Sequence, residues 1–528
     1  MDLPESSDSH ALSPLADVVI TSFEKQDIQN HEKKIKVNPV VSKVATWYEK
    51  LRNAMEYREE EVVLRAAIER ILKRRLLLGG NAQNSAEPLV RELVWARYLP
   101  DNAVPESITR KVEESIDLFL NLRLSILKQH KLPDNVINEW IYHLMSSDIE
   151  HVLNPNKEKE AMNNFMYQIL KEHVMITDDT EETKNAQVYI AVRRSFSRDD
   201  IAFLRYHLFK LYFGRLTQEN AEEVATEFLD GYKEIVRQLK YVRKEKIYTY
   251  VKKRTAAFFI LEDIMREHQG KSRELIKNNE AFASVVYDAC QTRYDSIRSK
   301  VRRAIVRSVL FILFTKVIFA FAIEGTYERI VYGQILWPSI ILNTSFPPLI
   351  MVVVSLFIKT PDKGNSERVL GYIKQILFEE HPQLGNPLEI QQKPEKQKPI
   401  ASIFTILWLF AFLTSFGSII YVLRLLHFNP VSQGIFIFFL TIVSFLSYRI
   451  SLMANLYRVG DRTGLVTPFV DFLFMPVIRV GRQLTHGISQ INILLFIFDF
   501  IIETPFKVIF AFFEQWFLFL HSKREDLE

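Results

Sequence analysis

Lys316 occupies the position in this sequence most suited to unusual chemistry, because it lies within an apolar run at residues 305–323. A charged side chain is costly in hydrocarbon, so it commonly marks a path for ions, protons or a substrate. At 1.5 Å per residue, Lys316 lies about 18 Å from the start of the run. We therefore take it as the first member of a candidate intramembrane polar site. The alternative is that Lys316 extends outward toward Glu324 or Glu328.

A second polar group lies in the next apolar run, residues 335–358. If the two runs are antiparallel, Asn343 to Ser345, about 12 to 15 Å from the start of this run, lie near the depth of Lys316. Proline lacks an amide proton and clashes with the preceding turn, so Pro347 and Pro348 predict a kink or break here, as in many transporters. The alternative is that the prolines only shape packing. The candidate site comprises Lys316, Asn343, Thr344, Ser345, Pro347 and Pro348.

A run of basic residues forms a second candidate site, suited to phosphate groups. Its members are Arg237, Lys240, Arg243, Lys244, Lys246, Lys252, Lys253 and Arg254. Interleaved tyrosines add to its suitability for anionic lipid headgroups or for nucleic acid. The solvated face of a long helix explains the same charges. Of the two phosphate-bearing partners, we favour the lipid surface.

The sequence contains no constellation typical of catalysis. The best groups of candidate side chains are His143, Asp148 and His151, and Glu379, Glu380 and His381. Neither group has the spacing of metal ligands, since His143 and His151 are two helical turns apart. We therefore expect no enzyme activity, no cofactor and no metal ion.

Composition divides the chain into two parts that suit two solvents. Residues before about 304 are rich in charged side chains, whereas later residues include most of the 39 phenylalanines, in long uncharged runs. Over the whole chain, 67 basic and 63 acidic residues give a net charge of only +4, which excludes a general attraction to nucleic acid. The single cysteine, Cys290, has no partner for an internal disulfide.

The first part, residues 41–303, is predicted to be an α-helical cytoplasmic domain, because apolar residues recur at spacings of three and four. A flexible leader at 1–40 precedes it. The predicted helices are 44–72, with Gly79 and Gly80 marking its end, 88–98, 107–129, 133–153, and one or two long helices over 219–269. Ser197 to Asp200 resembles a capping box ahead of a helix that reaches Leu211. Only Gln187 to Val192 alternates well enough to compete as a strand.

The second part predicts a bundle of four transmembrane helices in two hairpins. The apolar runs are 305–323, 335–358, 400–423 and 434–452, each near the ~20 residues needed to cross a bilayer. The hairpins thus occupy 304–358 and 400–454, joined by a cytoplasmic linker at 359–399 with a short amphipathic helix. Residues 455–528 are predicted to be interfacial amphipathic helices with a charged tail, and the alternative for 488–520 is a fifth transmembrane helix. The fold class is an all-α membrane protein.

Flanking charge predicts the orientation of these helices. Basic residues crowd the entrance of the first run at 293–307, recur through 359–399 and follow the fourth run, while the opposite ends carry few. By the positive-inside rule, both termini are cytoplasmic. The N-terminus lacks the basic start and apolar core of a signal peptide, so we expect none to be cleaved.

Two functions fit these features. The leading one is a multi-pass membrane anchor that presents a helical cytoplasmic interaction domain, as a non-enzymatic scaffold or assembly factor. Its partners are the lipid bilayer and a protein bound by the helical domain, and nucleic acid is not expected. The alternative is a channel or transporter with a polar pathway at Lys316 and the proline-containing second run.

Overall fold

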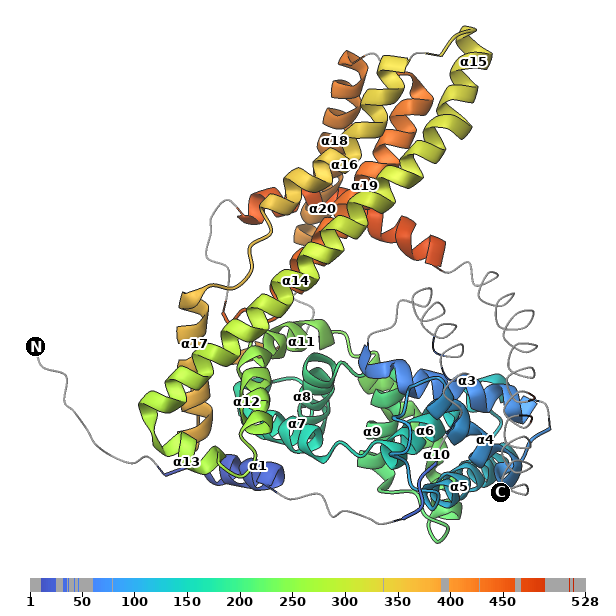
Figure 1. Cartoon of the computed structure of the whole chain (residues 1–528), viewed down its shortest axis with the longest axis vertical. Coiled ribbons are helices and arrows are strands. Elements are labelled where there is room, and N and C mark those ends of the chain that lie inside the picture. Colours follow the sequence, from blue (N-terminus) through green and yellow to red (C-terminus); the bar gives the residue numbers. More distant parts are fainter. Residues whose placement is uncertain are drawn as a thin grey trace, which may run out of the picture. The chain divides into compact units, whose positions relative to one another are not determined.

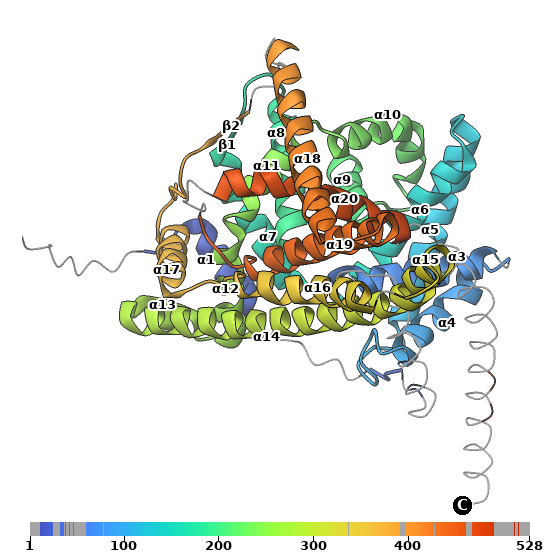
Figure 2. The same ribbon diagram turned by 90° about the horizontal axis from the view of Figure 1, so that it is seen from above.

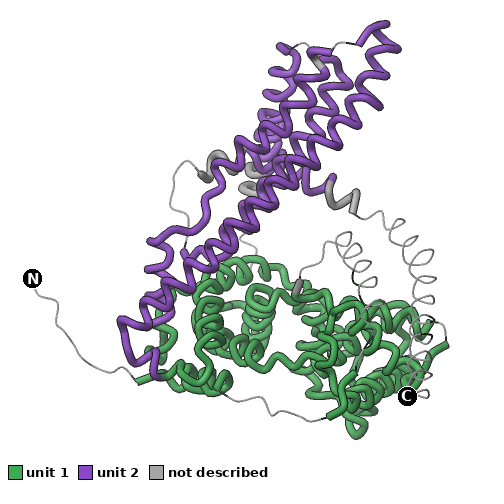
Figure 3. Tube along the Cα trace, in the orientation of Figure 1, with its two compact units in different colours: residues 1–273, 375–392, 497–528 green, residues 274–374, 393–496 purple. Residues whose placement is uncertain are grey.

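The computed structural model describes residues 11–24, 32–35, 60–77, 79–335, 337–390, 398–426, 428–460 and 467–489, with a few single residues besides. The described residues are mostly helical, and their only strands are β1 (Val174–Ile176) and β2 (Leu388–Ile390). The all-α fold class is therefore confirmed. The chain divides into two compact units (Figure 3), which include the described residues of 1–273 and 375–392 (unit 1) and of 274–374 and 393–496 (unit 2).

Unit 1 is built from helices joined by short connections (Figure 1). Its α-helices are α1 (Pro14–Glu24), α3 (Val63–Leu77), α4 (Ala82–Trp95), α5 (Ile108–Gln129), α6 (Asp134–Leu153), α7 (Lys157–Leu170), α8 (Glu181–Val192), α9 (Ile201–Phe213), α10 (Ala221–Leu239), α11 (Lys244–Lys252) and α12 (Thr255–Glu267). Shorter turns are η1 (Glu60–Val62), η2 (Lys171–His173) and the π-helical turn η3 (Arg193–Ser197).

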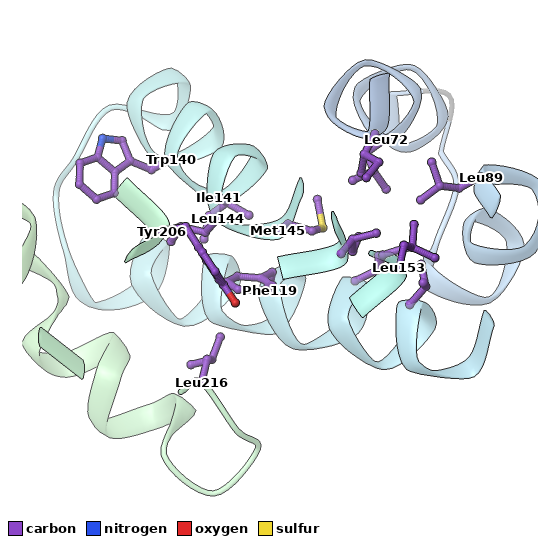
Figure 4. Close-up of a cluster of buried hydrophobic side chains, with 14 of the residues drawn as sticks. Leu72, Leu89, Phe119, Trp140, Ile141, Leu144, Met145, Leu153, Tyr206 and Leu216 are labelled. Carbon is purple, nitrogen blue, oxygen red and sulfur yellow. The ribbon is translucent and has the colours of Figure 1, made fainter. Parts of the chain in front are cut away.

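One hydrophobic core joins α3, α4, α5, α6, α9 and α10. Figure 4 shows Leu72, Leu89, Phe119 and Trp140 lying in this core, each from a different helix, together with Tyr206 of α9. Burying one such side chain stabilises the fold by about 1.5–3 kcal/mol, so these contacts hold six helices together.

Residues 375–392 complete unit 1, although the sequence predicts them to be part of a linker. β2 pairs in parallel with β1, with Val174 opposite Leu388. The buried guanidinium of Arg254 donates from Nε to the carbonyl oxygen of Leu384 at 2.8 Å. The hydroxyl of Tyr250 donates to the carbonyl oxygen of Asn386 at 3.0 Å.

Helix boundaries in unit 1 match the predictions well for α5, whose apolar stripe is regular, and for α6. The possible strand at 187–192 is wrong, because these residues lie in α8. Nearly all of that segment is buried, so it lacks the one-sided apolar pattern that identifies a helix. The capping box is also wrong: Asp200 itself caps α9 by accepting from the amides of Ala202 and Phe203. The region 219–269 contains three helices instead of one or two.

The leader predicted to be flexible contains α1. Its residues Ala16, Ile20 and Phe23 are buried, and Arg273 forms ion pairs with Asp17 and, at 3.1 Å, with Glu24. The burial of these apolar residues explains why this segment is ordered as a helix. Most of the predicted helix at 44–72 before residue 60 lies outside the described residues.

Unit 2 contains the apolar helices. The chain enters it through α13 (Ser272–Lys277), and the further elements are α14 (Asn279–Phe319), the π-helical turn η4 (Ala320–Gly325), α15 (Thr326–Tyr332), α16 (Trp337–Leu356), α17 (Lys363–Phe378, which ends in unit 1), α18 (Lys398–Leu425), α19 (Pro430–Ala454) and α20 (Thr467–Ser489). α14, η4 and α15 form one helix of 54 residues, about 80 Å long, so the predicted domain boundary near 303 lies within a continuous helix.

Three helices among the described residues are long and apolar enough to cross a membrane: Asn279–Tyr332, Thr405–Leu425 and Pro430–Ala454. The remaining predicted run corresponds to α16, in which the shorter segment Ile340–Leu356 is apolar. The outward surface is also apolar, since Leu310 and Phe314 expose 60% and 69% of their area. Such a surface suits lipid and would be costly in water. The chain is therefore membrane-associated.

Within unit 2, α14, α16 and α19 pack against one another, and α20 packs against both α18 and α19. Figures 1 and 2 both show α20 lying across α18. Gly481 permits the contact of α20 with α19, because a Cβ atom there would lie 2.0 Å from the carbonyl oxygen of Thr441. The predicted in-plane segment beyond residue 489 lies outside the described residues, apart from two single positions.

Candidate functional site

Lys316 is paired with a carboxylate inside unit 2. Its Nζ donates to Oε1 of Glu324 at 2.8 Å, and neither side chain has any exposed area. Residues eight apart lie about 80° apart around a regular α-helix. The π-helical turn η4 contains Glu324 and underwinds the helix, which turns the carboxylate back toward the Lys316 face. Lys316 therefore reaches Glu324 without reaching the protein surface.

The carboxylate of Glu324 joins three helices. Its Oε2 accepts a hydrogen bond from Nδ2 of Asn343 on α16 at 2.6 Å, and one from Oγ of Ser432 on α19 at 3.4 Å. Asn343 Nδ2 also lies 3.3 Å from the carbonyl oxygen of Ser432, to which it donates. Hydrogen bonds to an ionised carboxylate are among the stronger ones in proteins, so this cluster fixes the positions of the helices that share it.

A second buried carboxylate extends the cluster. Oε1 of Glu328 on α15 accepts from Nδ2 of Asn429 at 3.0 Å, and Glu328 has no exposed area. The Oδ1 atom of Asn429 in turn accepts from the amide of Ser432 at 2.8 Å, which caps the start of α19. Asn followed by Pro at the first helical position is a regular start signal. One asparagine therefore both begins α19 and attaches it to α15.

An aromatic ring covers the ammonium group of Lys316. Nζ lies 5.1 Å from the ring centroid of Phe439 on α19, in a cation–π arrangement. Phe439 also packs edge-on against Phe319 of α14, with ring centroids 5.3 Å apart. Aromatic rings from α14 and α19 thus lie beside the buried ion pair.

The polar residues predicted on α16 divide between different environments. Asn343 belongs to the cluster, whereas Thr344 is half-buried and Ser345 is exposed. Asn343 Oδ1 and Thr344 Oγ1 are buried, and among the described residues neither atom has a hydrogen-bond partner. The cluster therefore has more polar atoms than the described protein groups satisfy.

Of the predicted kink or break at Pro347 and Pro348, the break is not found, because α16 continues through both residues, and the kink stays a prediction. The prolines nevertheless remove the amide donors that the carbonyl oxygens of Asn343 and Thr344 would meet four residues later. Packing against α14 and α19 supports the helix through this interruption. The loss of donors therefore falls on the same two residues whose side-chain oxygens lack partners.

The basic run does not form one surface. Arg254 is buried, and its guanidinium binds backbone carbonyls and lies 3.5 Å from the centroid of the Tyr250 ring. Arg237 pairs with Glu234 at 2.8 Å, and Nζ of Lys244 donates to the carbonyl oxygen of Leu239 at 2.6 Å. These three residues stabilise unit 1. The others are exposed or half-buried.

The candidate histidines lie apart in unit 1. His143 is close to Glu69 (3.7 Å) and Arg205, and burial lowers the pKa of its imidazole to about 4. His381 pairs with Glu172 at 2.9 Å, and this contact raises its pKa. Among the residues that the structure describes, no group of three His, Cys, Asp or Glu side chains is placed to hold a metal ion.

Sequence reasoning missed a network of buried charges in unit 1. Arg65 of α3 is 2% exposed and pairs with Glu69 and Asp200, each at 2.6 Å, and its guanidinium also donates to Oγ of Ser146 at 3.2 Å. Asp200 is the N-cap of α9, so Arg65 attaches the start of that helix to α3 and α6. The contact joins residues 135 positions apart, which no local pattern reveals.

The π-helical turn η3 holds the other half of this network. Arg193 pairs with Asp199 at 2.6 Å and with Glu160 at 2.7 Å. Between them Arg198 has a left-handed backbone (φ 58°), which turns the chain so that Asp199 faces Arg193. A non-glycine residue in this conformation is strained, and the surrounding ion pairs hold it. The dense charges of residues 193–200 between apolar segments are the only sequence signal for this site.

Comparison of the chain with protein-family models, with curated proteins and with solved structures finds no match. The function must therefore be inferred from the two sites themselves. The cluster around Glu324 can hold helices together or contribute oxygen atoms to a cation. The network in unit 1 connects helices through arginines that pair with carboxylates, an arrangement that suits a structural role.

The carboxyl of Glu150 offers a test of how strongly the interior of unit 1 disfavours an unpaired charge. Its Oε2 is buried, and no described group bonds to it; burial raises the pKa of its carboxyl to about 8 from an ordinary 4.5. The folded state therefore keeps a proton that the unfolded state releases, so the stability of the wild type falls as pH rises from about 4.5 through 8. We expect Glu150→Gln to raise the unfolding midpoint at pH 8.5, with a much smaller gain at pH 5. Thermal unfolding of the purified full chain measures this.

Glu227→Gln serves as the control for that experiment, because Glu227 is exposed on α10. Its substitution should change the midpoint little at either pH. A Glu150→Gln variant that is less stable than the wild type at pH 8.5 would contradict a protonated, buried Glu150.

The ion pair of Lys316 and Glu324 predicts strong coupling between two substitutions. Lys316→Met leaves the buried carboxylate of Glu324 without its cation, and breaking a buried pair costs roughly 3–5 kcal/mol. Lys316→Met with Glu324→Gln removes both charges and should restore most of the loss. The measurement is the unfolding midpoint of the purified full chain. Lys363→Met, at an exposed position on α17, is the control, and additive losses in the double variant would exclude the coupling.

Proposed function

We propose that this chain is a multi-pass membrane anchor that presents a helical interaction domain at the cytoplasmic face, as a non-enzymatic scaffold or assembly factor. The observation that carries the proposal is the completion of unit 1 by residues 375–392, which follow α16 in the sequence. The chain thus leaves unit 1, passes through apolar helices and returns to it. A domain joined to its anchor by several chain passages is held more firmly than one on a single linker.

This return supports two membrane crossings between residues 273 and 375. β1 and β2 pair directly, so both lie on the same side of any membrane that the chain crosses. The helix through α14 crosses once, and the chain needs a second crossing to come back. α16 fits that role, because its 20 residues span about 30 Å, the thickness of the hydrocarbon core. The need for a return crossing is independent of how apolar α16 is.

Flanking charge supports a cytoplasmic position for unit 1. Arg298, Lys300 and Arg303 precede the apolar part of the first helix, and the linker after α16 is rich in lysine. The segment between Tyr332 and Trp337, at the opposite end, has no basic residue. The same rule places the ends of a second hairpin, formed by α18 and α19, on the cytoplasmic side.

The enclosed ion pair supports a structural role for the intramembrane cluster. Lys316 already has a carboxylate and an aromatic ring as partners, and it has no exposed area with which to bind a solute. A carboxylate shared by α14, α16 and α19 acts as a clamp that fixes their packing. Polar contacts of this kind stabilise helix association in membranes by about 0.6–2 kcal/mol each.

Cysteine labelling tests the proposed orientation. In a Cys290→Ala background, we expect single cysteines at Gln334 and Val431 to react with a membrane-impermeant thiol reagent in intact cells. Cysteines at Asn84 and Asn386 should react only after permeabilisation, because unit 1 is proposed to face the cytoplasm. Cys290→Ala without an added cysteine gives the background. Labelling of Asn386 in intact cells would contradict the two-crossing arrangement of α14 and α16.

A second candidate function is a channel or transporter for a small cation or proton. The observation in its favour is the pair of buried oxygens, Asn343 Oδ1 and Thr344 Oγ1, which have no hydrogen-bond partner among the described residues. The carbonyl oxygens of the same residues lose their amide donors to Pro347 and Pro348. Asn343 also binds Glu324, so its unpartnered oxygen lies near a carboxylate, and such oxygen atoms suit a hard cation or water.

Thr344→Val tests this second function with little disturbance of the fold. The substitution removes a hydroxyl that has no partner among the described residues and nearly keeps the side-chain volume. If the pathway exists, flux of protons or monovalent cations into proteoliposomes should exceed that of empty liposomes and fall several-fold in Thr344→Val. Ser345→Ala, on the exposed side of α16, should leave flux unchanged. Wild-type flux equal to that of empty liposomes would exclude the conduit and leave the anchor.

A further inference from the structure

The turn between α10 and α11 combines exposed positive charge with an exposed apolar side chain. Val242 is 87% exposed, the highest value among the large apolar side chains that the structure describes. Lys240 and Lys246 are exposed on either side of it, and Arg243 is half-buried. We call residues 240–246 the basic turn. Within it, Lys240, Arg243 and Lys246 are not among the basic residues that stabilise unit 1, whereas Lys244 donates to the carbonyl oxygen of Leu239.

The basic turn carries four basic residues and one acidic residue, Glu245. Among the described residues, no carboxylate pairs with Lys240, Arg243 or Lys246. The single acidic residue of α11, Glu245, is held by Arg194, whose Nη1 lies 3.0 Å from its Oε1. The nearest carboxylate in the sequence is therefore already occupied. The positive charges of Lys240, Arg243 and Lys246 therefore remain available to a partner, close in sequence to the exposed apolar side chain of Val242.

We infer that the basic turn contacts anionic lipid headgroups at the surface of the membrane that holds the chain. This inference rests on the proposed function in one respect, that unit 1 lies beside a membrane surface. Each Lys or Arg near an anionic bilayer favours the bound state by roughly fivefold. Val242 adds to this by entering the boundary between headgroups and acyl chains, where apolar side chains are favoured.

The surroundings of the tyrosines favour lipid over nucleic acid as the source of phosphate. Single-stranded nucleic acid binds through bases that stack on aromatic rings. The Tyr248 ring is covered by the guanidinium of Arg194 at 4.3 Å, and the Tyr250 ring by that of Arg254 at 3.5 Å. Tyr241 is buried. Nucleic acid would also leave Val242 in water, whereas a lipid surface accepts it.

A fluorescent probe at the tip tests the inference in the full chain. The variant Val242→Cys in a Cys290→Ala background carries an environment-sensitive dye, and the protein is placed in nanodiscs of phosphatidylcholine with or without phosphatidylserine. We expect a blue-shifted emission only with phosphatidylserine, and quenching by spin-labelled lipid in the same discs. Raising the salt concentration to about 0.5 M should reduce the shift, because salt screens the attraction between charges at a surface.

Charge reversal with a matched control identifies the residues responsible. Lys240→Glu with Lys246→Glu should lower the ratio of membrane-bound to unbound basic turn by at least about 25-fold, from a fivefold loss for each of the two cations removed. Lys128→Glu with Lys131→Glu changes the net charge by the same amount at exposed positions elsewhere in unit 1, and should have no effect. A dye at Leu124, an exposed apolar residue on α5, should not respond to phosphatidylserine.

Three outcomes would overturn the inference. They are identical emission in the two kinds of nanodisc, an unchanged shift in the Lys240→Glu, Lys246→Glu variant, and a larger response to an added oligonucleotide than to phosphatidylserine. None of these would affect the labelling of Asn386 from the cytoplasmic side, so failure of the basic turn and failure of the anchor are distinguishable.

Discussion

A lysine ammonium surrounded by apolar helices is stable only where a carboxylate and other polar groups replace the water that it has lost. In unit 2 that requirement links residues from three segments of the chain. Glu324 supplies the charge, η4 turns it toward Lys316, and Asn343 and Ser432 bind its second oxygen. One ion pair therefore explains why the polar side chains of Lys316, Asn343 and Ser432 lie together, although they come from three different helices. Without Lys316 there would be no reason to bury Glu324, and without Glu324 the contact between α16 and α19 would keep only the bond from Asn343 to the carbonyl oxygen of Ser432.

The sequence identifies this site only in part. An uncharged run makes Lys316 and Asn343 conspicuous, and depth alone predicts that they lie near one another. The sequence names Glu324 as a possible partner only for a lysine that extends outward, because eight residues of regular helix would turn the two charges onto different faces, whereas the pair is buried. The π-helical turn corrects that offset, and nothing in the local composition marks it. Ser345 shows the opposite limitation, since its sequence neighbours are in the cluster while its side chain lies outside it.

The fold, like the site, is predictable from the sequence only in part. A helix with a single apolar stripe, such as α5, is predictable because one face meets the core and the other meets water. α8 is not, because burial on most sides removes the stripe. β2 and α1 escape prediction for a different reason: each is short, and each depends on a partner far along the chain, Val174 for β2 and Arg273 for α1. Contacts at such distances are set by the whole fold.

Basic residues illustrate how surroundings decide the role of a side chain. Lys316, Arg254 and Lys240 have the same charge, yet the first pairs with a buried carboxylate, the second binds backbone carbonyls and the third lies exposed. Desolvation explains the difference, because a buried cation must recover the interactions that it loses with water, whereas an exposed one keeps them. The first two charges are therefore used within the protein. Only a cation that keeps its hydration, and lacks a protein partner, still has its charge available for a surface outside the molecule, and this distinction separates the basic turn from the rest of the run.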